Sequence, residues 1–274
     1  MNLPVLTLIV LALLQSTTAP ARRPSSAGQE TAILKRQAEA GDVKAQVRLG
    51  LVYASGDGVE ADGPEAVKWF RMAADRGDAS GEYYLGEMYG TGRGIPVDYA
   101  ESLRWLRRAA DQGEAHAQSN LAAMYAQGLG VGKDEAEAAK WMHKAADHGL
   151  AAGQFGLGSM YAHGRGVPQS EAEAVTWYRK AADQGDTPAM NNLAILLATS
   201  SDPKIRNPKE AVSLAEKAIE LDPHNPSYLD TLATVYFDAG QPDKAAETER
   251  RALALKPENP SYKQALEKYQ AAKP

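Results

Sequence analysis

Acidic and polar residues spaced three apart are the side chains of this sequence that could do acid–base chemistry. The pairs are Asp62/Glu65, Asp98/Glu101, Asp134/Glu137 and Ser170/Glu173. Two neighbouring carboxylates can act as general acid and general base. The same spacing is also that of a capping box, in which both side chains accept hydrogen bonds from N–H groups at the start of a helix. Because the pair repeats along the chain, we interpret it as a helix cap and predict that the protein is not an enzyme.

Glycine pairs of the form Gly-x-Gly could indicate a loop that binds phosphate. They are Gly56/Gly58, Gly92/Gly94, Gly128/Gly130 and Gly164/Gly166. A phosphate-binding loop needs a preceding strand and a following Lys-Ser or Lys-Thr, and the sequence has neither at these places. We therefore predict that the glycine pairs form turns.

Histidines and cysteines limit the metal chemistry that the chain can do. The chain has no cysteine, which excludes disulfides, cysteine-ligated zinc and iron–sulfur clusters. The five histidines are His116, His143, His148, His163 and His224. His143 and His148 are separated by a step that does not align them on a helix, and no third ligand lies nearby in the sequence. We expect no metal and no cofactor.

Composition and charge favour a folded protein that does not bind nucleic acid. The 274 residues include 30 Lys+Arg and 35 Asp+Glu, which gives a formal net charge of −5. This charge does not attract phosphate backbones. Hydrophobic residues make up 44% and charged residues 24% of the chain, close to the values of globular proteins. The sequence therefore predicts a hydrophobic core and excludes nucleic acid as a partner.

The N-terminus has the pattern of a secretory signal peptide. An apolar run, Leu3–Leu14, is followed by Ala19-Pro20-Ala21, a small-x-small cleavage pattern. The run is shorter than the ~20 residues that cross a membrane, so we expect no stable membrane span. We predict a signal peptide over residues 1–21, cleavage after Ala21, a flexible linker over 22–30, and a secreted or periplasmic protein. No basic residue precedes the apolar run, and Arg22-Arg23 follow it. This charge pattern leaves open the alternative that the N-terminus is an uncleaved anchor.

A repeat of 36 residues organises the rest of the chain. All four tryptophans, Trp69, Trp105, Trp141 and Trp177, follow this step. In the first copy, apolar residues at helical spacing predict one helix from about Val43 to Ala54 and a second that begins after Asp62 and stops near Gly77. Two such helices cannot bury their apolar faces alone, so the units must stack into an all-α solenoid.

The period shortens to 34 residues in the C-terminal part. Leu221-Asp222-Pro223 returns as Leu255-Lys256-Pro257, and Asn225-Pro226-Ser227-Tyr228 returns as Asn259-Pro260-Ser261-Tyr262. We assign a partial unit and four 36-residue units to residues 31–185, and 34-residue units with a capping helix to residues 186–274.

The pattern A-x3-L-G-x2-Y-x2-G-x-G-V-x2-D-x3-A-x2-W-x3-A-A-x2-G, which begins at Ala45, resembles the Sel-one-like repeat, a relative of the tetratricopeptide repeat. The C-terminal units resemble tetratricopeptide repeats themselves. The resemblance implies a right-handed α/α superhelical solenoid and a non-enzymatic scaffold or adaptor of the bacterial envelope. The alternatives are a secreted enzyme or carbohydrate-binding protein of the envelope, and an adaptor held by an uncleaved N-terminus.

Residues that differ between copies of the repeat are the candidates for binding. In solenoids of this kind the first helix of each pair lines the concave groove, where aromatic side chains anchor a protein or peptide and asparagines hold its backbone. The predicted groove residues are Arg48, Tyr83, Tyr84, Glu87, Asn120, Phe155, Asn191 and Asn192. An alternative for the aromatic members is that they fill gaps between helices.

Overall fold

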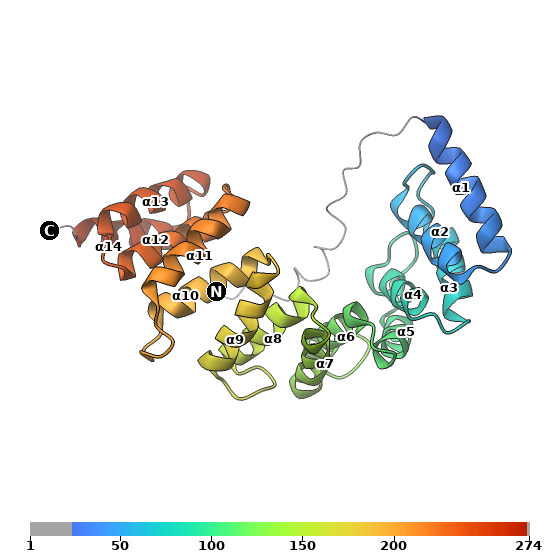
Figure 1. The fold of residues 1–274 in the computed structure, drawn as a ribbon, viewed down its shortest axis with the longest axis horizontal. Coiled ribbons are helices and arrows are strands. Elements are labelled where there is room, and N and C mark those ends of the chain that lie inside the picture. The colour runs from blue at the N-terminus through green and yellow to red at the C-terminus, as the bar shows by residue number, and fades with distance from the viewer. Residues whose placement is uncertain (1–23, 273–274) are drawn as a thin grey trace. The chain divides into compact units, whose positions relative to one another are not determined.

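The structure, a computed structural model, describes residues 24–272, and within this range it consists of helices and their connections, without strands. The helices, labelled in Figure 1, are α1 (Pro24–Glu39), α2 (Val43–Ser55), α3 (Gly63–Ala74), α4 (Ala79–Thr91), α5 (Tyr99–Asp111), α6 (Ala115–Gln127), α7 (Glu135–Asp147), α8 (Ala151–His163), α9 (Glu171–Asp183), α10 (Thr187–Thr199), α11 (Pro208–Leu221), α12 (Pro226–Asp238), α13 (Pro242–Leu255) and α14 (Pro260–Ala271).

The chain divides into two units, the first ending at His148 and the second beginning at Gly149. In the first unit each helix from α1 to α7 packs against the next one along the chain, and the same holds from α8 to α14 in the second. Contacts between neighbours in sequence are what a stack of helix pairs requires. The predicted fold class, an all-α solenoid of helix–turn–helix repeats, is confirmed.

The connections within each helix pair are made as the glycines predict. Gly56 caps α2 in the left-handed conformation with φ of 75°, and Gly58 has φ of 78°. The Asp62 side chain then accepts a hydrogen bond from Glu65 N–H (2.9 Å) and starts α3. The Asp62 N–H donates to the Tyr53 carbonyl (2.9 Å). This last bond joins the end of the first helix to the start of the second.

The glutamates three residues after the N-cap residues do not form the predicted capping boxes. Glu65 does not complete a capping box, because Asp62 N–H is already bound to Tyr53. Instead Glu65 Oε1 accepts a hydrogen bond from Trp69 Nε1 (2.9 Å). The same bond joins Glu101 to Trp105 and Glu137 to Trp141, each at 2.9 Å. In these three copies the acidic residue therefore satisfies the one polar side-chain atom of the tryptophan.

Helix α1 changes the predicted organisation of the N-terminal part. It begins at Pro24, so residues 24–30, expected to belong to a flexible linker, are helical. A proline is compatible with the first turn of a helix, and further along α1 Leu34 and Ala38 pack with Leu49 and Trp69. The expected signal peptide lies outside the described residues. Among residues 24–272, no helix is long and apolar enough to cross a membrane.

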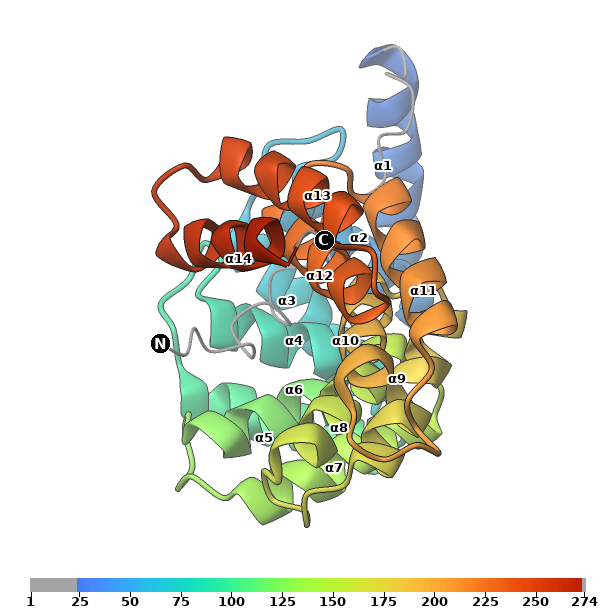
Figure 2. The ribbon, with the colours of Figure 1, turned by 90° about the vertical axis from the view of Figure 1, so that its left-hand side faces the viewer.

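The C-terminal helices contain an acidic pair, of which one member is fully buried and the other half-buried. Figure 2 shows α12, α13 and α14, whose neighbours in sequence pack together. Glu249 on α13 is fully buried, and burial and the negative charge of Asp230 on α12 raise its pKa to about 8. Burial also raises the pKa of Asp230. At neutral pH Glu249 is therefore mainly protonated. The predicted capping helix corresponds to α14, which buries Tyr262 and Tyr269.

Replacing Trp141 tests the tryptophan frame. Trp141 is 5% exposed, donates to Glu137, and has Lys144 Nζ 3.7 Å from its ring centroid. Truncating a buried aromatic side chain costs about 3–5 kcal/mol. We expect Trp141→Ala to lower the melting temperature, measured by circular dichroism, by several degrees. The control Lys140→Ala removes an exposed partner of Glu137 and should leave the melt nearly unchanged. An unchanged Trp141→Ala melt would contradict the packing.

The buried acid makes stability depend on pH. Because folding raises the pKa of Glu249 to about 8, its proton is held more tightly in the folded state. The resulting stability is complete below the ordinary pKa of a glutamic acid, ~4.3, and is lost as the pH rises through 8. We expect melting temperatures to fall between pH 5 and pH 9, by more than in the neutral Glu249→Gln variant. Exposed Glu267→Gln is the control, and parallel curves for Glu249→Gln and the unchanged protein would be the contrary result.

Candidate functional site

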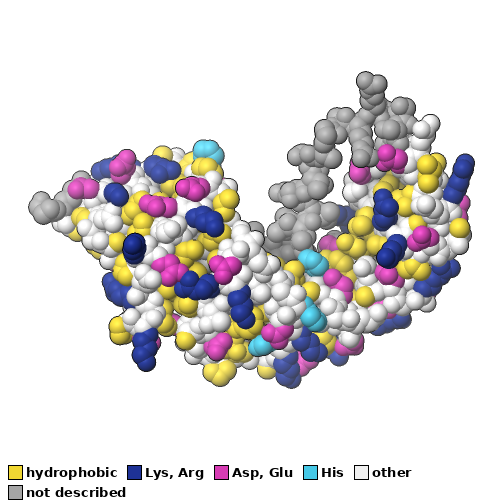
Figure 3. Space-filling view, in the orientation of Figure 1, with side chains coloured by type: hydrophobic (Ala, Val, Ile, Leu, Met, Phe, Trp, Pro, Cys, Tyr) yellow, Lys and Arg dark blue, Asp and Glu magenta, His cyan; other side chains and the backbone are white. Residues whose placement is uncertain are grey.

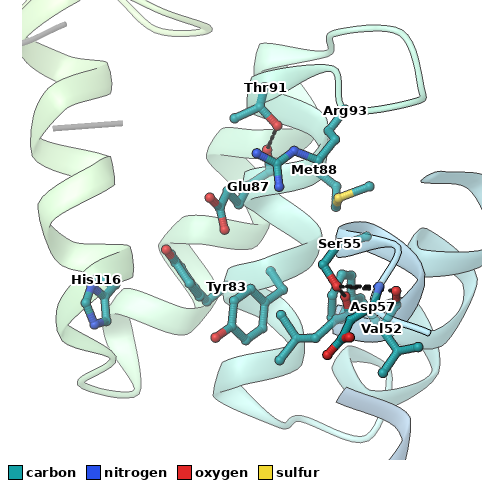
Figure 4. Close-up of a pocket in the computed structure, with 13 residues that line it drawn as sticks. Val52, Ser55, Asp57, Tyr83, Glu87, Met88, Thr91, Arg93 and His116 are labelled. Atoms are coloured by element: carbon teal, nitrogen blue, oxygen red, sulfur yellow. Dashed lines mark hydrogen bonds between the residues drawn. The ribbon is translucent and has the colours of Figure 1, made fainter. Parts of the chain in front are cut away.

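A pocket of about 320 Å³ opens on the first unit, lined mainly by α2 and α4 and bounded on one side by α6 (Figure 4). Its lining combines aromatic, aliphatic and charged side chains. The lining residues are Leu51, Val52, Ala54, Ser55, Asp57, Phe70, Tyr83, Tyr84, Glu87, Met88, Thr91, Arg93 and His116. The pocket is large enough for one or two side chains of a partner.

The spacing of side chains along α4 brings the pocket residues together. Tyr83 and Glu87 are four residues apart, as are Tyr84 and Met88, so each pair lies on one side of the helix. Gly86 lies between them, and a Cβ there would be 2.8 Å from Leu106 Cγ on α5. One side of α4 is therefore pressed against α5, and the pocket forms on another.

A row of four rings forms one wall of the pocket. Phe70 and Tyr84 stack with ring centroids 5.3 Å apart, and Tyr83 and Tyr84 are tilted with centroids 4.9 Å apart. The row continues to His116, whose ring centroid is 5.8 Å from that of Tyr83. Tyr83 is only 6% exposed, whereas Tyr84 is half-buried. Tyr83 therefore also fills a gap between helices, and Tyr84 offers more surface to a partner.

Burial changes the ionisation of the acidic groups at the pocket. Burial raises the pKa of Glu87, against the opposing effects of Arg93, a hydrogen bond from Tyr83, and His116. Burial, followed by the charges of Glu87 and Glu114, raises the pKa of both tyrosines. Both phenols are therefore neutral at physiological pH and can donate hydrogen bonds.

The pocket contains three of the predicted groove residues, Tyr83, Tyr84 and Glu87. Two other predicted groove residues are in the same unit but do not line the pocket. Arg48 is exposed on α2, and Asn120 is half-buried on α6.

The remaining predicted residues form a separate cluster in the second unit. The ring of Phe155 on α8 lies 5.7 Å from that of Tyr178 on α9, centroid to centroid. On α10, Asn192 Nδ2 donates to the Tyr178 hydroxyl (3.4 Å) and Asn191 Nδ2 donates to Asn192 Oδ1 (3.4 Å). These side chains bond to one another around Tyr178, a residue that the sequence did not single out.

Sequence reasoning also missed two charged residues of the pocket. Asp57 and Arg93 are the middle residues of the first two Gly-x-Gly turns. The turns were interpreted only as backbone geometry, and their positive φ angles confirm that interpretation. The signal was available, because the middle residue changes from copy to copy while its glycines do not.

The charged groups of residues 24–272 form no metal site, and the face drawn in Figure 3 shows no basic surface. Among the described residues, no group of three or more histidine, aspartate and glutamate side chains could hold a metal ion. On the face seen in Figure 3, basic and acidic side chains are interspersed in both units.

The family of the chain follows from its repeats. The Sel1 repeat model matches residues 43–78, 79–114, 115–150, 151–186 and 187–223, which together exceed half of the chain. The chain belongs to the Sel1 repeat family. A tetratricopeptide repeat model matches residues 206–269. The fifth Sel1 repeat extends past the boundary predicted at residue 185 and includes α10 and α11, because the longer loop between these helices hid the period. Proteins built from Sel1 and tetratricopeptide repeats are generally non-enzymatic scaffolds for protein interactions.

Solved structures of bacterial Sel1 repeat proteins are similar to this chain. A Sel1 repeat protein from Oxalobacter formigenes is 27% identical with a TM-score of 0.64, over 85% of this chain and 97% of that one. The protective antigen c5321 of uropathogenic Escherichia coli is 31% identical with a TM-score of 0.53, over 82% of this chain. The chain covers 56% of c5321, little more than half of its length. No curated protein sequence matches the chain.

Proposed function

We propose that this Sel1 repeat protein is a non-enzymatic scaffold of the bacterial envelope that binds a segment of a partner protein in the pocket of its first unit. The observation that carries the proposal is the pair Tyr83 and Tyr84 beside a partly buried Glu87, in a pocket of about 320 Å³. Aromatic side chains of this kind supply most of the binding energy at protein interfaces.

The tyrosine pair is not needed by the repeat itself. The two positions hold different residues in the other copies, namely Val47/Arg48, Ser119/Asn120, Phe155/Gly156 and Asn191/Asn192. All these copies form the same helices. A pair of tyrosines that the helix does not require, placed at a pocket, supports a role in binding.

The mode of binding and the location rest on two further observations. YrrB, a tetratricopeptide repeat protein with an unusual peptide-binding site, shares the fold at 18% identity with a TM-score of 0.53, over 72% of this chain and 97% of that one. The apolar run Leu3–Leu14 with Ala19-Pro20-Ala21 after it supports export to the envelope.

We also propose that the cluster around Phe155, Asn191 and Asn192 contacts the same partner.

Cross-linking from the pocket tests the proposed function. A photoreactive phenylalanine at position 84 should capture a discrete protein in cells, and one at position 140, exposed on α7, should not. With that partner purified, Tyr84→Ala should weaken binding in isothermal titration by about 2 kcal/mol or more, because it removes an anchor. The melting temperature should stay within a few degrees.

Tyr99→Ala provides the matched control, since Tyr99 is 39% exposed and does not line the pocket. It should keep the affinity of the unchanged protein. If Tyr84→Ala and the unchanged protein bind the partner with equal affinity, the binding site lies outside the pocket.

N-terminal sequencing tests the location. We expect the chain recovered from the periplasm or medium to begin at Arg22, because a signal peptidase cleaves after small residues such as Ala19 and Ala21. A chain that still begins at Met1 and sediments with membranes would instead indicate an N-terminal anchor.

A further inference from the structure

We propose that the pocket selects a cationic side chain, an arginine or a lysine, from the partner segment. This inference rests on the proposed function and adds the chemistry of the occupant. Three observations carry it: the π surfaces that form the wall, the excess of negative charge around them, and the absence of the same combination in the second unit.

The wall consists of aromatic surface, which attracts cations. Phe70, Tyr84 and Tyr83 follow one another at centroid distances of 5.3 and 4.9 Å, and Tyr84 is only half-buried. A guanidinium or ammonium group within about 6 Å of such a ring is stabilised by its quadrupole, by ~0.5–2 kcal/mol. The protein uses this contact elsewhere: Arg107 Cζ lies 5.6 Å from the Tyr125 ring centroid and 5.9 Å from that of Trp141.

The charges around the rings favour a positive occupant. Asp57 and Glu87 line the pocket, and Glu114 is close enough to affect both tyrosines. Arg93 is the one arginine or lysine in the lining, and His116 also lines the pocket. The lining itself therefore holds two carboxylates against one arginine. Glu87 is partly removed from water, which disfavours its ionised form. A cation from the partner would stabilise that ionised form.

Arginine fits the geometry of the groups better than an apolar side chain. Its planar guanidinium can stack on Tyr84 while its N–H groups donate to a carboxylate such as Glu87. Its methylene stem can pack on Leu51 and Met88, which also line the pocket. Lysine would make the same contacts with a single point of charge.

The second unit provides an internal comparison. Its positions equivalent to Tyr84 and Glu87 are Gly156 and Ser159, and the equivalent of Arg93 is Arg165, which donates to Ser159 Oγ (2.9 Å). The carboxylate is missing there and the arginine remains. Cation selection is therefore expected only in the first unit.

Selection from a random heptapeptide library on phage tests the inference with the full-length protein. The unchanged protein, the Tyr83→Ala, Tyr84→Ala double variant and Glu87→Gln are used as baits. We expect peptides enriched by the unchanged protein to share an arginine or lysine at one position. The double variant should enrich none of them, and Glu87→Gln should lose the basic consensus. Circular dichroism confirms that each bait is folded, and if the double variant is not, Tyr84→Ala replaces it.

A thermodynamic cycle with a selected synthetic peptide separates charge recognition from general binding. Replacing its basic residue by norleucine should weaken binding to the unchanged protein by about tenfold, ~1.4 kcal/mol, and to Glu87→Gln much less. Glu258→Gln, which removes an equal charge from an exposed site in the second unit, should behave like the unchanged protein.

The outcomes distinguish the two proposals. Peptides with an apolar consensus that require Tyr84 would overturn cation selection and leave the proposed binding function standing. No enrichment above the double variant would overturn both. A basic consensus that persists in Glu87→Gln would show that diffuse charge, and not this pocket, recognises the cation.

Discussion

The close contact between the two helices of each repeat is the constraint on which the rest of the structure depends. On α2, a Cβ at Gly50 would lie 2.5 Å from Phe70 Cε1 on α3, and on α8 a Cβ at Gly158 would lie 2.7 Å from Tyr178 Cδ1 on α9. The second helix therefore packs directly on the backbone of the first. This contact occupies one side of the first helix of the repeat. Another side remains for the neighbouring repeats or for a partner.

The helix pair is fixed further by hydrogen bonds that recur with the repeat. The backbone N–H of the N-cap residue donates to a tyrosine carbonyl in four copies, from Asp62 to Tyr53, Asp98 to Tyr89, Asp134 to Tyr125 and Ser170 to Tyr161, each at 2.9 Å. With the geometry of the pair set by these residues, the other positions of the first helix are free to vary. The pocket at Tyr84 and Glu87 arises from that variation, and so does the different cluster around Tyr178.

Periodic features were predictable from the sequence, and the hydrogen-bond partners of individual side chains were not. The repeat placed Trp141 in the core and Gly56 at a turn, because apolar spacing and positive φ are local requirements. The partner of Glu137 was missed, since its bond to Trp141 depends on which rotamer the packed indole adopts. The helical state of residues 24–30 was missed because their composition alone is typical of a linker.

The candidate site shows the same division. Tyr83, Tyr84 and Glu87 were recognisable as variable residues on one side of a helix, but the turn residues Asp57 and Arg93 enter the pocket only through the folded loops. Phe155 had the same sequence signal as Tyr83 and packs against Tyr178. Variation between copies thus identifies the side of the helix that can bind, and the fold determines which residues share a pocket.

Hydrogen–deuterium exchange measured by mass spectrometry most directly tests the claim that the first helices of the first unit bind and the second helices support them. The protein is compared alone and saturated with the partner captured from position 84. We predict slower exchange in residues 43–55, 79–91 and 115–127, with residues 99–111 and 135–147 unchanged. Protection confined to residues 99–111 and 135–147 would contradict the claim and place the partner on the second helices.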